Sequence, residues 1–311
     1  MNSYRSKLVV LGVAALSLAP FLLLSEYKYG FVQKLRFELR AERHLAATYS
    51  EAMAVERVRY LPDNIMPLVA TAHPESDPSL EFSVYPNDLS ESGLSDDYVP
   101  TLWNRQALQE AAALLTPVRS EYARRARVEF VCCDAAALDV AAIRGDVPPF
   151  ETAGIPVELT VEFDRPMAAA DPELMYRAAK ALQSSDALAL ERLVFRFPMK
   201  ESVGTAVFAI PGGAVASIAS ANDLELYNLS SMPARRLAER IGATLHWNEA
   251  THEAVFTRGD TTLVVREWEE EALLNGEAID NPTPADIGDT LELMVSVRLI
   301  ERAFGEKIEL Q

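Results

Sequence analysis

The sequence has very little cysteine and histidine, two residues that often bind metals. Its two cysteines, Cys132 and Cys133, are adjacent, and neighbouring residues of a strand point to opposite faces, which disfavours a disulfide between them. We expect both to pack as small apolar residues, with a redox or metal role as the alternative. The four histidines, at positions 44, 73, 246 and 252, are scattered and follow no metal-site spacing. The sequence therefore predicts neither a disulfide scaffold nor a metal or other cofactor.

The motifs of common enzyme classes are also missing. The chain has no Gly-x-Ser-x-Gly elbow, no P-loop, no His-Glu-x-x-His zinc motif and no dinucleotide fingerprint. Carboxylates are plentiful, but a run such as Glu269-Glu270-Glu271 is typical of a solvated strand or loop. We therefore assign no catalytic, cofactor-binding or metal-binding residue, and the sequence does not identify the residues that bind a ligand or partner.

Basic residues are in the minority. Lysine and arginine total 29 against 46 aspartates and glutamates, so the formal net charge is -17. This charge opposes binding to nucleic acid and to anionic membrane surfaces. A solvated acidic surface is the simplest interpretation, and a cation-binding surface is the alternative. Because 49% of the residues are hydrophobic, the composition is that of a globular protein.

One long uncharged run is present, near the N-terminus. Arg5 and Lys7 precede the run, which covers residues 8–25, and this order is typical of a secretory signal or a signal anchor with a cytoplasmic N-terminus. Its length is close to the minimum for a membrane-spanning helix. We find no small-x-small cleavage site. We therefore predict that residues 1–29 are a single-pass membrane anchor, with the C-terminal domain outside the cytoplasm; a cleaved signal, which would make the protein secreted, is the alternative.

Residues 30–61 are predicted to form a membrane-proximal helix. Leu35, Leu39 and Ala46 follow mixed three- and four-residue spacings, and a partner-binding coiled coil is the alternative to a packed amphipathic helix. The next stretch, residues 62–100, is rich in proline, serine and aspartate, which predicts surface loops with at most one strand, at residues 80–85. Its acidic residues lack the spacing of a calcium loop.

Residues 62–210 as a whole are predicted to be a middle α+β module. After the loops we expect a helix over residues 103–125 and another that Asp171 caps and Pro172 begins. Alternating apolar residues predict strands at residues 127–133, 155–163, 193–197 and 205–210. Helices over a small, mostly antiparallel sheet satisfy this pattern. We find no family resemblance in this module.

The last predicted domain covers residues 211–311 and begins at Pro211-Gly212-Gly213. Ser231 is expected to cap a helix that ends before Gly242. Short strands are expected at residues 244–247, 254–257 and 261–266, and Asn275-Gly276 predicts a tight hairpin. The helix pattern recurs at an offset of 63 residues, as from Arg235 to Arg298. We therefore predict two helix/strand repeats.

Short motifs in residues 220–311 carry a family resemblance. They are Met232-Pro233-Ala234-Arg235, Leu237-Ala238-Glu239, Ile241-Gly242-Ala243, Leu245-His246-Trp247-Asn248 and Leu274-Asn275-Gly276. This segment resembles the bacterial stalk domain, also called the copper amine oxidase N-terminal-like domain. The second copy departs from the pattern, with Ser296 in place of proline and Leu310 in place of tryptophan. The resemblance implies a non-catalytic, extracytoplasmic, wall- or surface-associated module, commonly of Gram-positive bacteria.

Oxidase chemistry does not follow from this resemblance. A copper amine oxidase needs a His-x-His pair and an Asn-Tyr-Asp/Glu site, and the sequence has neither. His246 and His252 flank a predicted turn and could meet across a hairpin, but we favour ordinary exposed positions over copper or zinc binding. Trp247 is expected to be a core or interface aromatic, with a platform for a sugar as the alternative.

These features favour a membrane-anchored, extracytoplasmic binding or scaffolding protein of the bacterial cell envelope, without catalysis. A cell-wall polymer or an envelope protein would be the partner, and residues 8–25 would hold the chain in the membrane. One alternative is a cell-envelope hydrolase with a cleft in residues 100–210, lined by paired carboxylates or by Cys132 or Cys133 with a histidine. The other is an envelope sensor or regulatory accessory protein that acts through residues 31–61.

Overall fold

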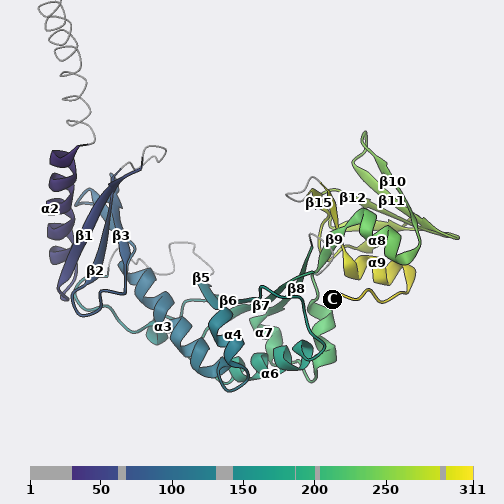
Figure 1. The fold of residues 1–311 in the computed structure, drawn as a ribbon, viewed down its shortest axis with the longest axis horizontal. Helices are drawn as coiled ribbons and strands as arrows, with labels where there is room; N and C mark the ends of the chain where they lie inside the picture. The colour runs from purple at the N-terminus through teal and green to yellow at the C-terminus, as the bar shows by residue number, and fades with distance from the viewer. Residues whose placement is uncertain are drawn as a thin grey trace, which may run out of the picture. The chain divides into compact units, whose positions relative to one another are not determined.

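The computed structural model describes residues 30–61, 68–130, 143–185, 187–199, 204–287 and 292–310. The chain divides into two compact units: unit 1 is residues 1–105 with 134–149, and unit 2 is residues 106–133 with 150–311. Both combine helices with mostly antiparallel sheets, which confirms the predicted α+β class (Figure 1). The predicted anchor at residues 8–25 and the pair Cys132-Cys133 lie outside the described residues. Among the helices that are described, none has the length and apolarity to cross a membrane.

Unit 1 is a helix packed on a four-stranded antiparallel meander in the order β1-β2-β3-β4. Its elements are α2 (Phe31–Thr48), β1 (Met53–Tyr60), β2 (Leu68–Pro74), β3 (Phe82–Pro86), β4 (Leu94–Asp96) and the start of α3 (Tyr98–Leu115). Helix α2 buries Phe37, Ala41 and Leu45, which share one face at four-residue spacing. This face contacts β1 and β2, and Figure 1 shows the helix running beside them.

Two predictions for this region are wrong. The helix predicted for residues 30–61 ends at Thr48, and Met53–Tyr60 is strand β1, whose valines and Tyr60 favour extended backbone. Residues 62–100 contain three strands where at most one was expected. The expected strand corresponds to β3, and β2 and β4 hydrogen-bond to its two edges. Their stability comes from pairing with the neighbouring strands of the meander, which composition does not reveal.

Unit 2 contains a seven-stranded sheet in the order β15-β16-β9-β8-β7-β6-β5. Its first elements after α3 are α4 (Ser120–Arg125), β5 (Ala126–Phe130), α5 (Phe150–Ala153), β6 (Val157–Glu162), α6 (Asp171–Gln183), β7 (Leu190–Pro198), β8 (Thr205–Pro211), α7 (Gly212–Val215) and the 3-10 helix η2 (Ala221–Tyr227). The strands agree with the predicted ones to within a few residues. The helix predicted for residues 103–125 is two helices, α3 and α4, because Pro117 lacks the N–H that a continuous helix needs.

Helices α4, α6 and α7 lie on one face of this sheet (Figure 1). Alternate residues of β6 are fully buried, Val157, Leu159 and Val161 among them, as expected for a strand with one face on the core. Phe195 and Phe197 on β7 extend the same core. Of the paired strands that the structure describes, β6 and β7 alone run parallel, and α6 connects them.

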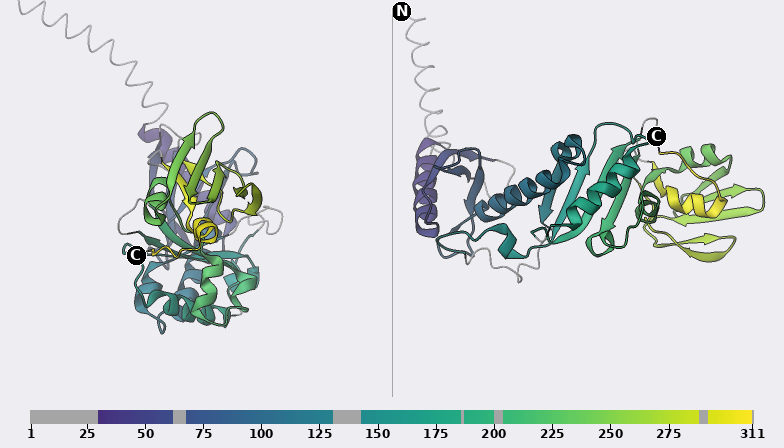
Figure 2. Two further views of the ribbon diagram at one scale, coloured as in Figure 1. Left: turned by 90° about the vertical axis from the view of Figure 1, so that its right-hand side faces the viewer. Right: turned by 90° about the horizontal axis from the view of Figure 1, so that it is seen from below.

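The C-terminal part of unit 2 repeats a strand and a helix. Its elements are β9 (Ser231–Pro233), α8 (Ala234–Ile241), β10 (Thr244–Asn248), β11 (Glu253–Arg258), β12 (Thr261–Arg266), β13 (Glu271–Leu274), β14 (Glu277–Asp280), β15 (Asp286–Ile287), β16 (Leu293–Ser296) and α9 (Val297–Phe304). Strands β10 to β14 form a five-stranded meander beside the two helices (Figure 2). Strands β9 and β16 pair antiparallel, with Met232 opposite Val295. Both helices therefore begin at equivalent places, 63 residues apart as the sequence predicts.

The two helices begin differently. Ser231, predicted to be a cap, lies in β9, and the N-cap of α8 is Pro233, which provides no side-chain hydrogen bond. In the second copy Ser296 is the N-cap, and its hydroxyl accepts a hydrogen bond from the Leu299 N–H. The departure from proline at position 296 therefore exchanges a rigid residue for a capping one.

The seven-stranded sheet includes strands from both sides of the boundary predicted at residue 211. Strand β8 ends at Pro211, and β9, β16 and β15 continue the sheet beyond it. Gly212 is required for packing, because a Cβ atom there would lie 1.5 Å from the carbonyl oxygen of Leu190. The Pro-Gly-Gly sequence thus marks a close approach of two backbone segments inside unit 2.

Candidate functional site

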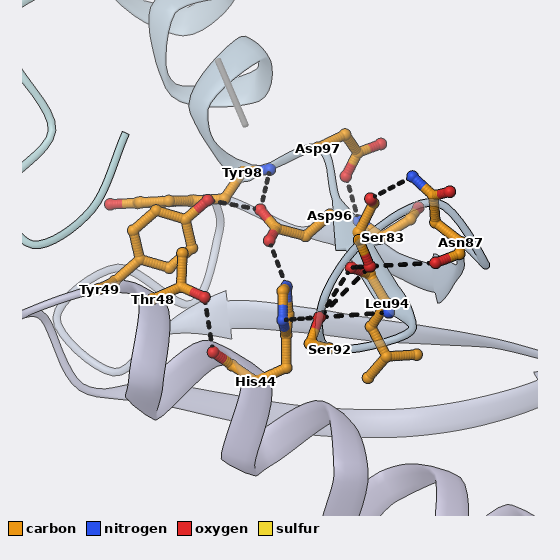
Figure 3. Close-up of polar contacts among 12 residues, drawn as sticks. His44, Thr48, Tyr49, Ser83, Asn87, Ser92, Leu94, Asp96, Asp97 and Tyr98 are labelled. Atoms are coloured by element: carbon orange, nitrogen blue, oxygen red, sulfur yellow. Dashed lines mark hydrogen bonds and ion pairs between the residues drawn. The ribbon is translucent and has the colours of Figure 1, made fainter. Parts of the chain in front are cut away.

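A buried histidine–aspartate pair lies in unit 1, between α2 and the end of β4. The Nε2 atom of His44 is 2.9 Å from Oδ2 of Asp96. The two side chains are 9% and 6% exposed. His44 lies one turn before the end of α2, and Asp96 is the last residue of β4 (Figure 3). Burying a carboxylate is costly unless its oxygens are hydrogen-bonded.

Asp96 meets that requirement through further donors. Its Oδ1 atom accepts hydrogen bonds from the Tyr49 hydroxyl at 2.7 Å and from the Tyr98 N–H at 3.1 Å. Burial raises the pKa of Tyr49, and the nearby charge of Asp96 raises it further. Tyr49 therefore remains a hydrogen-bond donor at neutral pH. The Asp96 carboxylate is fixed by three residues from both sides of the site.

Ser92 extends the chain of polar contacts on the other side of the imidazole. Its Oγ atom is 3.1 Å from Nδ1 of His44, so hydroxyl, imidazole and carboxylate follow one another (Figure 3). Ser92 belongs to the turn before β4, and its Oγ also lies 3.0 Å from the Leu94 carbonyl oxygen. Gly93 follows with φ at 68°, a conformation that favours glycine.

These residues form part of the wall of a cavity of about 830 Å³, here called the unit 1 cavity. Its cationic lining comes from Arg40 and Arg43 on α2 and from Arg144. The hydroxyl groups in the lining belong to Thr48, Tyr49, Tyr85, Ser90, Ser92 and Ser95, and the carboxylates to Glu91, Asp96 and Asp97. The cavity is within the size range of small-molecule sites, and its lining is more polar than is usual for them.

The sequence does not predict this site. The spacing between His44 and Asp96 is 52 residues, and no local motif connects them. The hydrolase alternative expected a cleft in residues 100–210, whereas the unit 1 cavity is lined mainly by residues 40–49 and 85–97. The cysteines named for that cleft lie outside the described residues. Only the packing of α2 against the meander brings the polar groups together.

The C-terminal residues singled out by the sequence take other positions. His252 lies in a turn, and its Nδ1 is 2.9 Å from Oε2 of Glu267, whereas His246 lies on β10 opposite Val255. Within the described ranges, no cluster of three or more histidine, cysteine or acidic side chains could hold a metal. Trp247 is half-buried and lines a smaller cavity of about 260 Å³ together with Pro233 and Arg235.

The duplicated strand–helix unit and its five-stranded meander define a small α+β module at the end of the chain. Residues 226–311 match the profile of the copper amine oxidase N-terminal domain. The family resemblance read from the motifs is thereby confirmed for this segment.

Other comparisons add little. A solved structure of a DUF5037 family protein from Ruminococcus gnavus ATCC 29149 is similar at 10% sequence identity, over 64% of this chain and 90% of that chain, with a TM-score of 0.27. A likeness of this size carries no conclusion about fold or function. No curated protein matches the chain.

Proposed function

We propose that the chain is a membrane-anchored, extracytoplasmic binding protein of the bacterial cell envelope, of Gram-positive type, and that its ligand occupies the unit 1 cavity. Residues 8–25 would hold it in the membrane. The copper amine oxidase N-terminal-like domain would provide a second contact, to a cell-wall polymer or to another envelope protein. The uncharged N-terminal run, the acidic composition and the family match at residues 226–311 support this proposal.

The observation that carries the binding role is the unit 1 cavity. Its frame is set by buried hydrogen bonds, since His44, Tyr49 and the Tyr98 N–H all hold Asp96. A site whose polar groups are already held in place loses little conformational entropy when a ligand arrives. The cavity therefore offers a preorganised surface to a small polar molecule or to one unit of a polymer.

Filling the cavity tests this role. Ala47 lines the cavity and Ala46 does not, although both are exposed on α2. Soluble fragments of digested cell wall are titrated into the full-length protein in detergent micelles, and the heat of binding is measured. We expect Ala47→Trp to weaken binding at least tenfold and Ala46→Trp to leave it unchanged. Equal binding by both variants, or no binding by the unmodified protein, would refute the proposed function.

The location is tested separately. A reporter enzyme that is active only outside the cytoplasm is fused after Gln311. Activity in intact cells is the expected result, and it should disappear when residues 8–25 are deleted. An inactive reporter, in cells that contain the fusion protein at full length, would contradict the membrane-anchored extracytoplasmic assignment.

A second candidate function is hydrolysis. The contacts from Ser92 to His44 and from His44 to Asp96 favour it. A base within hydrogen-bond reach of a hydroxyl, oriented by a carboxylate, is the arrangement of acyl-transfer triads. Ser92 Oγ would attack an ester carbonyl, its proton would pass to His44 Nδ1 and then to the departing alcohol, and water would release the acyl group. We place this function second because the Ser92 hydroxyl also contacts Leu94 within its own turn.

A covalent probe decides between the two functions. A fluorophosphonate should label Ser92 if the triad is active, and Ser92→Ala should abolish the labelling while Ser95→Ala, also in the cavity wall, should retain it. Absence of labelling in the unmodified protein would remove the hydrolase alternative and leave the binding role.

A further inference from the structure

We propose that the ligand of the unit 1 cavity carries an anionic group, a phosphate or a carboxylate, which binds between Arg40 and Arg43. This inference rests on the proposed function, because it names the chemistry of the ligand in the same cavity.

The two arginines lie on one side of α2. They are three residues apart, which places them on neighbouring positions of the same helix surface, and both line the cavity. Neither forms an ion pair with any residue that the structure describes. Arg105 and Arg125, by contrast, are each paired with a carboxylate. The Arg40 guanidinium reaches the turn before β4, since a Cβ atom on Gly93 would lie 3.2 Å from its Nη2 atom.

The carboxylates of the cavity are largely occupied by protein donors. Asp96 accepts from His44, the Tyr49 hydroxyl and the Tyr98 N–H. Asp97 accepts from the Ser83 N–H, and burial raises its pKa. Glu91 is exposed, as Arg40 and Arg43 are, so two guanidinium groups of the lining face one carboxylate that has no protein donor among the described residues. The unused capacity of the cavity is therefore mainly on the donor side, and a ligand must supply acceptors.

Guanidinium groups match one kind of acceptor well. They donate two parallel hydrogen bonds to a carboxylate or to a phosphate. The remaining lining includes the Ser95 hydroxyl, which accepts a hydrogen bond from the Asn87 amide and can still donate one, and the Tyr85 side chain. Burial and the charges of Asp97 and Asp96 raise the pKa of Tyr85, so its hydroxyl stays a donor. A hydroxylated anion, such as a sugar phosphate or a sugar acid, uses both parts of this surface.

The test compares three probes on the full-length protein in detergent micelles: glycerol phosphate, glucuronate and glucose. We expect saturable binding of an anionic probe that weakens as salt is added, and no binding of glucose. Whichever of the two anions binds more tightly identifies phosphate or carboxylate as the preferred group. Arg40→Gln and Arg43→Gln should each lower the affinity about tenfold, because each removes a charge and its charge-assisted hydrogen bonds to the anion.

The matched control is Arg36→Gln, since Arg36 is exposed on the same helix and does not line the cavity. It removes the same charge and should leave the affinity unchanged. A loss of affinity in all three variants would reduce the effect to overall charge and overturn the inference. Circular dichroism of each variant shows whether the fold is kept. The salt dependence of probe binding to the unmodified protein is a second test, and it needs no variant.

The failure of this inference can be told apart from failure of the proposed function. In one outcome, wall fragments bind the unmodified protein and Ala47→Trp weakens that binding, but neither anion binds and the arginine variants bind the fragments normally. The ligand is then neutral, and only the anion inference is wrong. If the wall fragments do not bind the unmodified protein at all, the binding role itself is wrong and the anion inference falls with it.

Discussion

At the scale of single residues, the His44–Asp96 pair is the part of unit 1 most sensitive to change. His44→Ala leaves Asp96 buried with two donors in place of three. Because removing one donor leaves a buried carboxylate oxygen without its hydrogen bond, we expect a loss of about 3 kcal/mol in the free energy of unfolding. Thermal unfolding checks this. His246→Ala removes an exposed imidazole and should change stability by less than about 0.5 kcal/mol; equal effects would mean that the buried pair is not stabilising.

Asp171 should make unit 2 sensitive to acid. Burial alone would raise its pKa, but hydrogen bonds from Arg165 and from the Ala168 N–H outweigh burial and lower it. The folded protein therefore binds this proton more weakly than the unfolded chain does. The stabilisation is complete above the ordinary value of 3.8 and is lost as the pH falls through the lowered pKa.

Calorimetry from pH 2 to 7 tests whether stability falls with acid in this way. Asp171→Asn should lower the unfolding temperature at neutral pH, because it removes the buried carboxylate that accepts from Arg165 and the Ala168 N–H. It should also reduce the fall of the unfolding temperature at acid pH. Asp164→Asn is the comparison, since its carboxylate is 69% exposed beside Arg125 and exposed pairs contribute little. If both variants decline with acid as steeply as the unmodified protein, Asp171 is not the group responsible.

At the scale of elements, the two C-terminal helices end in the same way. Gly242 and Gly305 have φ angles of 64° and 70°, and a Cβ atom on either would meet nothing within 4 Å. The cost of alanine is therefore purely that of left-handed backbone, about 1 kcal/mol at each position. Thermal unfolding of Gly242→Ala and Gly305→Ala should show equal losses. Gly213→Ala, in open space without a positive φ, should show none, and a loss there would contradict the backbone explanation.

Much of the element structure was predictable because it is local. The alternating strands of residues 155–163 and 205–210, the Asn275-Gly276 turn and the helix repeat follow from side-chain period and glycine positions. Strands β2 and β4 were missed because β2 contains alanine, threonine and histidine, and β4 has three residues. Their stability depends on β3, which pairs with both. The unit 1 cavity could not be predicted for the same reason, since His44 and Asp96 meet only after the meander has formed.

At the scale of the whole molecule, the seven-stranded sheet contains strands from both sides of Pro211, where the sequence predicts a domain boundary. The Leu229 N–H donates to the Val207 carbonyl, the Ser230 hydroxyl accepts from the Val207 N–H, and β9 meets β8 at Thr205 and Ser231. Helix η2 packs on both β8 and α6. These contacts cover the edge of β8, which would otherwise present unpaired backbone groups to other chains.

A chain truncated after Pro211 should therefore lose more than its C-terminal domain. Buried Phe208 and Ile210 would lie at an uncovered edge, so we expect faster amide exchange in β7 and β8 and a tendency to aggregate. A chain truncated after Phe304 keeps β9, β16 and both repeat helices and serves as the comparison. If amides of β7 and β8 exchange equally slowly in both truncated chains and in the full chain, Pro211 is a true domain boundary and the shared sheet does not couple its two sides. If exchange is faster only after truncation at Pro211, the domain identified at residues 226–311 is a structural part of unit 2.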